Sequence, residues 1–231
     1  MSKKSLDDNW VETLCVWADK NNISSKDFPR NRSELLTLTE LYMDDEYYFK
    51  KIPKELGNLT RLTALSFNIY DYTAESIPEE LAKLINLTEL HLTVYSNDNS
   101  EIILSKDIFN VKQLEQLTRL SLDGDLSYSS IDLILKNCKD LSYLGINNNC
   151  FLKYLSPSIC NLFSIGELVL INNENLLLTK KQFAWAESLR DDEKGFDKTY
   201  TTLLPDGTTY SYTTDYGQKF RYYCIIPFLN T

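Results

Sequence analysis

Six copies of one apolar pattern constrain this chain more than any other feature of its sequence. The pattern is (Leu/Ile)-x-x-Leu-x-(Leu/Ile/Phe/Met), and its copies begin at residues 38, 62, 87, 117, 141 and 165, so the intervals are 24, 25, 30, 24 and 24 residues. A period of this length is typical of a solenoid, in which each unit is a strand plus a return segment that cannot bury its apolar side alone. The sequence therefore predicts an α/β solenoid.

The apolar residues before each strand follow a mixed spacing. One unit has them at 52, 56, 59, 62, 65 and 67, and the next at 77, 81, 84, 87, 90 and 92. Steps of four and three are helical or 3₁₀ spacing, and the last step of two is strand spacing. We therefore expect short helical returns on one side of a parallel sheet, with one strand per unit and an extra turn in the longest unit.

Two of these units carry a resemblance to a known family. The strings IPKELGNLTRLTAL (52–65) and IPEELAKLINLTEL (77–90) resemble the Ile-Pro-x-x-Leu units of plant-type and bacterial leucine-rich repeats. The resemblance implies a leucine-rich repeat with its parallel β-sheet on the concave face, and an asparagine ladder to which Asn149 and Asn173 correspond. The Ser-Gly that precedes Ile-Pro in plant receptor repeats is missing here, which favours the bacterial type.

The ends of a solenoid expose apolar faces and need caps. Residues 1–30 are expected to form an N-terminal helical cap, because Trp10, Leu14 and Trp17 share one helical stripe. Residues 31–178 then hold about six repeats.

Residues 179–231 are expected to form a C-terminal cap, a helix followed by a β-hairpin or meander. Pro205-Asp206-Gly207 is a typical hairpin turn. The same tail is rich in tyrosine, which is common at interfaces, so the sequence leaves open whether it is a cap or a second binding surface.

Composition narrows the classes of partner. The formal net charge is -9, which argues against binding to nucleic acid or to an anionic membrane surface. No apolar run follows the first lysines, so a cytoplasmic protein is expected, or one translocated into a host cytosol by a route that reads no N-terminal signal. A monomer is expected. No metal-ligand spacing or phosphate loop occurs, so no cofactor is expected. The five cysteines lack a pairing pattern, so reduced thiols are expected.

Strand alternation predicts three columns of side chains on the concave side. The first column is Glu40, Ala64, Glu89, Arg119, Tyr143 and Glu167. The second is Tyr42, Ser66, His91, Ser121, Gly145 and Val169. The third is Asp44, Asn68, Thr93, Asp123, Asn147 and Ile171.

These columns are the candidate binding surface. Carboxylates outnumber the single arginine, so we expect a protein partner with a basic or basic-aromatic surface. The chain is therefore interpreted as a protein–protein interaction module, or alternatively as a secreted bacterial effector that binds a host protein. The residues expected to contact the partner are Glu40, Tyr42, Asp44, Asn68, Glu89, His91, Arg119, Asp123, Tyr143 and Asn147.

A different class of function rests on His91, the one histidine of the chain. Ser66 and Ser121 fall in its column and Glu89 on its strand, so a nucleophile, a base and a carboxylate can be assembled. A shallow sheet face offers no water-excluding pocket and no evident oxyanion donors. We therefore do not expect an enzyme, and a hydrolase acting through His91 stays the alternative.

Overall fold

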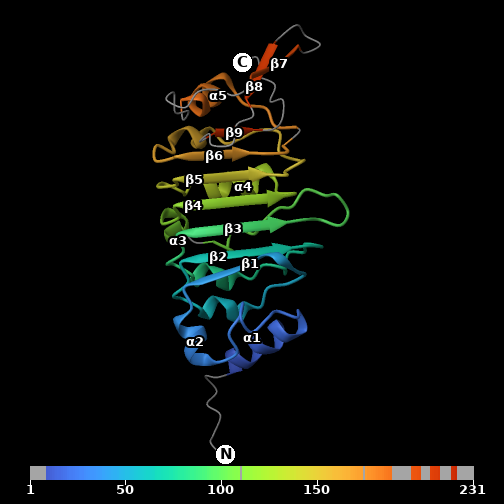
Figure 1. The fold of residues 1–231 in the computed structure, drawn as a ribbon, viewed down its shortest axis with the longest axis vertical. Coiled ribbons are helices and arrows are strands. Elements are labelled where there is room, and N and C mark those ends of the chain that lie inside the picture. The colour runs from blue at the N-terminus through green and yellow to red at the C-terminus, as the bar shows by residue number, and fades with distance from the viewer. Residues whose placement is uncertain are drawn as a thin grey trace, which may run out of the picture.

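A single parallel sheet runs along most of the molecule, which is elongated (Figure 1). The computed structural model describes residues 9–109, 111–173, 175–188, 199–203, 209–213 and 220–222. The strands of the sheet follow the order β1-β2-β3-β4-β5-β6-β9. The six repeat strands thus lie side by side in sequence order, which confirms the predicted sheet.

Each repeat strand contains one of the leucines that the pattern places at its centre. The strands are β1 (Glu40–Phe49), β2 (Ala64–Ile69), β3 (Glu89–Val94), β4 (Arg119–Gly124), β5 (Tyr143–Asn147) and β6 (Glu167–Leu170). The returns between them are helical or 3₁₀, as the spacing predicts: η2 (Lys54–Asn58), η3 (Glu79–Lys83), α3 (Val111–Glu115), α4 (Tyr128–Leu135) and η4 (Pro157–Asn161). The unit with the extra apolar step therefore returns through an α-helix, α3.

Proline sets where two of the returns begin. Pro53 and Pro78 are the N-cap residues of η2 and η3, with φ of -71° and -78°. Proline is favoured at helix starts because its fixed φ suits that position and the N–H it lacks would have no intrahelical partner. The Ile-Pro pair of each unit therefore ends the extended chain and starts the return.

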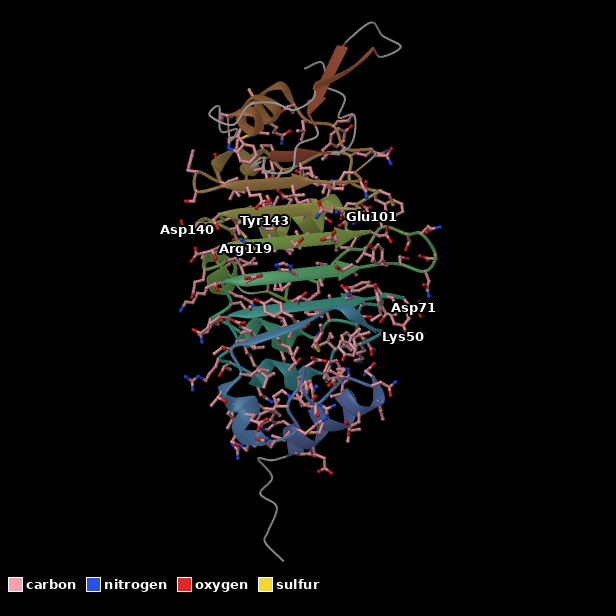
Figure 2. The ribbon with its side chains drawn as sticks, in the orientation of Figure 1. Lys50, Asp71, Glu101, Arg119, Asp140 and Tyr143 are labelled. Carbon is pink, nitrogen blue, oxygen red and sulfur yellow. The ribbon has the colours of Figure 1, made fainter. Side chains whose placement is uncertain are left out.

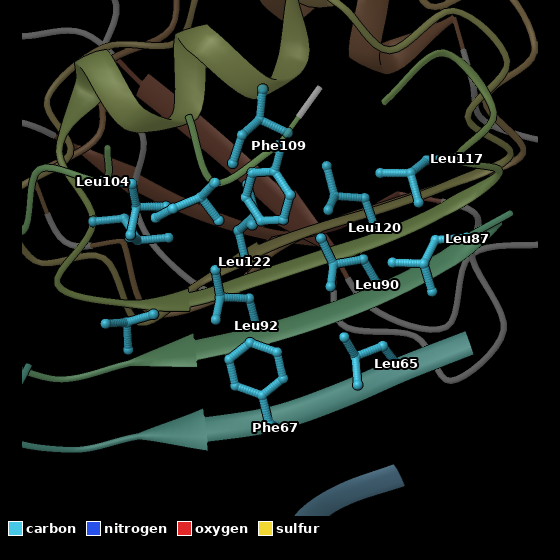
Figure 3. Packing of buried hydrophobic residues seen from close by; sticks show 14 of the residues in the cluster. Leu65, Phe67, Leu87, Leu90, Leu92, Leu104, Phe109, Leu117, Leu120 and Leu122 are labelled. Atoms are coloured by element: carbon cyan, nitrogen blue, oxygen red, sulfur yellow. The ribbon is translucent and has the colours of Figure 1, made fainter. Parts of the chain in front are cut away.

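The core lies between the sheet and these returns. Leu65, Leu90 and Leu120 point from neighbouring strands to the same side, where Leu104 and Phe109 from the long return also lie (Figure 3). All five residues are buried. Because strand side chains alternate, the residues between these leucines point to the opposite face of the sheet.

A ladder of hydroxyl groups links the residues that precede the strands. Each hydroxyl donates to the backbone carbonyl of the residue in the same place one unit earlier. The bonds run from Thr63 to Thr39 at 3.0 Å, from Thr88 to Thr63 at 3.1 Å, from Thr118 to Thr88 at 3.1 Å and from Ser142 to Thr118 at 3.0 Å. Sequence reasoning did not identify this ladder, although the repeated Leu-Thr or Leu-Ser before strands β1 to β5 marks it.

Asparagines form a second ladder after the later strands. Asn149 and Asn173 are both fully buried. The Asn149 backbone N–H donates to Asn173 Oδ1 at 3.1 Å, and Asn173 Nδ2 donates to the Ile146 carbonyl at 2.7 Å. These bonds satisfy backbone groups that the turn would otherwise leave unpaired.

The first helix, α1 (Asn9–Lys20), packs on the start of the core, and α2 (Arg32–Thr37) follows it. Leu14 and Ala18 are buried, and Trp17 is partly buried against them. The Trp17 ring lies 5.0 Å from that of Phe49 between centroids, and its Nε1 donates to the Lys51 carbonyl at 3.2 Å. The predicted helical stripe is therefore the face that packs, while the domain boundary at residue 30 stays a prediction.

The tail contains α5 (Lys180–Glu187) and the three short strands β7 (Thr199–Leu203), β8 (Thr209–Thr213) and β9 (Phe220–Tyr222). β7 and β8 are antiparallel, as expected for the hairpin. β9 instead pairs with β6 in parallel and becomes the seventh strand of the main sheet. The Pro205-Asp206-Gly207 turn and the tyrosine side chains of the tail lie outside the described residues, and the boundary at residue 178 stays a prediction.

Four cysteines fall within the described residues. Cys15, Cys138, Cys150 and Cys160 are free thiols, as expected, and Cys224 lies outside the described part of the chain. Burial raises the pKa of the Cys138 thiol to about 12. This thiol therefore behaves as a small apolar group within the core.

Candidate partner-binding face

The strand register places the first two predicted columns as expected. Glu40, Ala64, Glu89, Arg119, Tyr143 and Glu167 are successive partners across the six strands. So are Tyr42, Ser66, His91, Ser121, Gly145 and Val169. We call the side of the sheet that carries these columns the outer sheet face.

The third column differs from the prediction at its first position. Asn68 pairs with Tyr48 and not with Asp44, because the register of β1 shifts between Met43 and Tyr48. The residues between them form a bulge. The prediction that Asp44 belongs to the column is therefore wrong, and its side chain lies outside the described part of the structure.

Tyr47 holds this bulge in place. Its hydroxyl donates to Asp27 Oδ2 at 2.8 Å and accepts from the Ser24 backbone N–H at 3.1 Å. Its ring stacks on Phe49 at 6.4 Å between centroids. These contacts pull residue 47 toward the segment after α1, so the extra residues leave the ladder and Tyr48 takes the column position.

The other end of the third column also needs a correction. Asn68, Thr93, Asp123 and Asn147 lie in register, but β6 ends at Leu170 and its pairing with β5 ends at Gly145 and Val169. Ile171 is instead joined to this column through its backbone N–H, which donates to Asn147 Oδ1 at 3.0 Å.

The outer sheet face has exposed rims and a buried floor. Tyr42 is 44% exposed and Tyr48 is 57% exposed. Ser66, Asn68 and Ser121, in contrast, are 1%, 4% and 8% exposed. The difference marks a hollow of about 300 Å³ in the face. The hollow is lined by Tyr48, Ser66, Asn68, His91, Thr93, Tyr95, Ser121 and Asp123.

Sequence reasoning missed this hollow and two of its aromatic residues. It placed Asn68, His91 and Asp123 among the partner-binding residues, and all three line the hollow. It did not identify Tyr48, because the bulge is not visible in the apolar pattern, or Tyr95, which follows β3 directly. The run Asp44-Asp45-Glu46 is the one sequence signal of the bulge, since three acidic residues in a row fit poorly in a strand.

Glu89 and Arg119 form the charged part of the first column. Oε1 of Glu89 lies 3.0 Å from His91 Nε2, and Oε2 lies 3.7 Å from Arg119 Nε. The Arg119 guanidinium also stacks on Tyr143 in the next strand, 4.6 Å from the ring centroid (Figure 2). The one arginine of the columns is therefore engaged by its own neighbours.

Asp123 is the carboxylate of the hollow. Its Oδ2 accepts a hydrogen bond from Ser121 Oγ at 3.0 Å, and its Oδ1 accepts one from Asn148 Nδ2 at 3.2 Å. Burial raises the pKa of Asp123 above its ordinary value, and the hydrogen bonds and the nearby His91 offset only part of that rise. A buried carboxylate with a raised pKa is stabilised in its charged form by any cation that approaches it.

Gly145 has no side chain, yet there is little free space above it on this face. A Cβ at this position would lie 2.9 Å from Ser121 Oγ and 3.1 Å from the Tyr143 hydroxyl. Neighbouring side chains therefore already occupy the space above the glycine. The space for a partner lies instead over the hollow beside it.

The histidine and the serines of the enzyme alternative lie in one hollow without being paired. Ser66 Oγ has no hydrogen-bond partner within the described residues, and Ser121 Oγ donates to Asp123. The hollow thus contains candidate groups but no serine–histidine hydrogen bond of the kind that activates a nucleophile. The expectation that the chain is not an enzyme stays a prediction.

Two further features concern the described part of the chain. No cluster of three or more His, Cys, Asp or Glu side chains there is placed to hold a metal ion. Of the helices described, none has the length and apolar character to span a membrane.

Comparisons with known proteins add little to this geometry. No family model matches the chain, and no curated protein matches it. Among solved structures, the chain is similar to an internalin (inlF) from Listeria monocytogenes str. 4b F2365, at 22% identity and a TM-score of 0.38. The match covers 60% of this chain and 42% of the internalin chain, so this chain spans less than half of the internalin's length. A similarity at this TM-score carries no argument about fold or function.

Proposed function

We propose that this chain is a protein-interaction module of the leucine-rich-repeat type that binds its partner through the outer sheet face. The observation that carries the proposal is the exposure of Tyr42 and Tyr48 beside the polar hollow on that face. Exposed aromatic residues next to a concave floor are typical of the anchors that dominate protein interfaces.

The charge of the face supports a basic partner. Four carboxylates of the columns, those of Glu40, Glu89, Asp123 and Glu167, stand against the single guanidinium of Arg119. Arg119 already stacks on Tyr143 and lies near Glu89, so its charge is largely compensated. Complementary charge acts mainly on the rate of association and on the choice of partner, and aromatic anchors act mainly on dissociation.

A selection from a library of random peptides tests the proposal and requires no identified partner. We expect the peptides selected on the wild-type protein to be rich in arginine, lysine and aromatic residues. They should lose most of their binding to a Glu40→Gln, Tyr42→Ala double variant, which removes one charge and one anchor from the face.

The matched control is a Glu79→Gln, Tyr154→Ala double variant. Tyr154 is 44% exposed, as is Tyr42, and Glu79 is an exposed glutamate of η3, so the control removes the same groups from outside the columns. It should bind the selected peptides like the wild type. Selected peptides that lack basic residues, or that lose binding only to the control variant, would contradict the proposal.

A further inference from the structure

Two polar atoms of the hollow have no hydrogen-bond partner among the described residues, and both are buried. They are Ser66 Oγ and His91 Nε2, which belong to residues paired across β2 and β3. Ser66 is 1% exposed, so its hydroxyl lies at the floor of the hollow. A buried polar group without a partner costs free energy, and such a group in a native site indicates a ligand or an ordered molecule that satisfies it.

Two carboxylates, those of Glu89 and Asp123, lie near these two atoms. Glu89 Oε1 lies 3.0 Å from His91 Nε2, but the two atoms are not aligned for a hydrogen bond. Asp123 faces the same hollow, and its carboxylate accepts hydrogen bonds from the side chains of Ser121, Asn148 and Asn147. A carboxylate has about four lone-pair sites, so Asp123 retains capacity to accept further hydrogen bonds. No lysine or arginine is among the residues that line the hollow.

The dimensions of the floor limit what can satisfy these acceptors. Ser66, His91 and Ser121 lie on three adjacent strands, which spans about 10 Å at ~4.8 Å per strand. The next column, with Asp123, lies two residues further along the strands, a distance of about 7 Å. Tyr48 and Tyr95 border this floor, and aromatic rings attract cations.

We propose that the hollow is a binding site for one basic side chain of the partner, an arginine. A guanidinium carries a full positive charge and five N–H donors in a plane, which matches a floor of spaced acceptors bordered by tyrosine rings. The inference deepens the proposed function, because it rests on the outer sheet face being the binding surface and names the group that enters it.

Binding in the hollow can be measured directly through His91, because it is the only histidine in the chain. The ring signals of His91 can be followed by NMR while N-acetyl-arginine methylamide is added to the protein. We expect a saturable shift with this probe. The citrulline analogue has the same shape without the charge and should give no saturable shift, and the lysine analogue should give a weaker one.

Two variants locate the site. Asp123→Asn should weaken binding of the arginine probe about tenfold, since it removes a charge-assisted contact of ordinary strength. Ser66→Ala should weaken it by a smaller factor, since it removes a neutral acceptor. Asp140→Asn, an exposed aspartate outside the hollow, is the matched control and should bind the probe like the wild type.

The proposal is overturned if the arginine probe leaves His91 unchanged, if citrulline binds as well as arginine, or if Asp123→Asn binds the probe like the wild type. These outcomes are distinct from failure of the proposed function. If selected peptides bind the outer sheet face but the arginine probe does not bind, only the proposal of an arginine site in the hollow is rejected. Peptides that bind away from the face would reject the proposed function, and the probe would still report on the hollow.

Discussion

Ser66 and Ser130 are buried to the same degree, with 1% of each residue exposed, yet only Ser130 has hydrogen-bond partners. Ser130 Oγ accepts from the Leu104 backbone N–H at 2.8 Å and lies 3.2 Å from the Ile102 carbonyl, to which it donates. Ser66 makes no such bond within the described residues. The two serines thus form a matched pair in which one hydroxyl supports the fold and the other faces the candidate site.

The pair predicts opposite effects of the same substitution. Ser130→Ala should lower the free energy of unfolding by about 1 to 3 kcal/mol, because it leaves the buried Leu104 backbone N–H without its hydrogen-bond acceptor. Ser66→Ala should be neutral or slightly stabilising, because it removes a buried hydroxyl that has no partner. Urea unfolding of both variants checks this. A loss at Ser66 as large as that at Ser130 would mean that the Ser66 hydroxyl is bonded within the folded protein.

Asp123 gives a prediction about pH. Burial raises its pKa in the folded protein. The titratable groups that interact with it are those of His91, Tyr95 and Tyr143. The folded state then binds the Asp123 proton more tightly than the unfolded state. The free energy of unfolding therefore falls as pH rises from 3.8, the ordinary pKa of this carboxyl, through its raised pKa in the folded protein. Above that window, Asp123→Asn should therefore be at least as stable as the wild type.

The measurement is the melting temperature of both proteins across that range. The advantage of Asp123→Asn should shrink as pH falls below the ordinary aspartate pKa, where the wild-type carboxyl is protonated in both states. Asp140→Asn serves as the control and should show no such trend. A wild type that gains stability over Asp123→Asn as pH rises would show that Asp123 is stabilised in its charged form without a partner.

Gly57 lies where the two returns η2 and η3 come close together. A Cβ at this position would lie 2.3 Å from the Glu80 carbonyl oxygen, which belongs to the backbone of η3 and cannot move aside cheaply. Gly57→Ala should cost about 1 to 3 kcal/mol of stability, as expected for overpacking.

Gly166 is the matched control for this substitution. A Cβ there would lie 3.5 Å from the Ser142 carbonyl oxygen, an ordinary contact, so Gly166→Ala should be neutral or stabilise by up to about 1 kcal/mol. Thermal unfolding of the two alanine variants separates the cases. Equal stability of both would contradict the close stacking of η2 on η3.

Trp17 tests the role of the first helix. Trp17→Ala removes the ring contact with Phe49 and the hydrogen bond to Lys51, and it should cost about 3 kcal/mol, the lower end for a buried aromatic residue, because Trp17 is only partly buried. Val16 is 45% exposed on the same helix, so Val16→Ala should change stability by less than about 0.5 kcal/mol. A Trp17→Ala protein as stable as Val16→Ala would show that α1 is an appendage.

The order and register of the repeat strands could be predicted from the sequence, because the spacing of the leucines determines which residues pair. The step of two between Leu65 and Phe67, repeated in each unit, decides which residues face the core, and a slip of one residue would reverse every side chain. The first two columns followed from this rule. The same rule predicted that Arg119 and Tyr143 are neighbours in the first column, but it did not predict that the guanidinium stacks on the ring.

The same rule failed where the chain leaves the repeat. The bulge before Tyr48 is set by contacts of Tyr47 with residues 24 and 27, which are far from it in sequence. The parallel pairing of β9 with β6 lies in a tail without the period. The depth of the hollow depends on side-chain size in adjacent strands, since Ser66 lies between Tyr42 and His91, and no local pattern records that relation.

Carboxyl footprinting in the presence of a selected basic peptide tests the central claim most directly. A water-soluble carbodiimide labels exposed carboxylates, and mass spectrometry reads each site with and without the peptide. Bound peptide should protect Glu40 on the outer sheet face and leave Glu79 on η3 as reactive as before. Protection of Glu79 with unchanged labelling of Glu40 would contradict the claim that this face binds the partner.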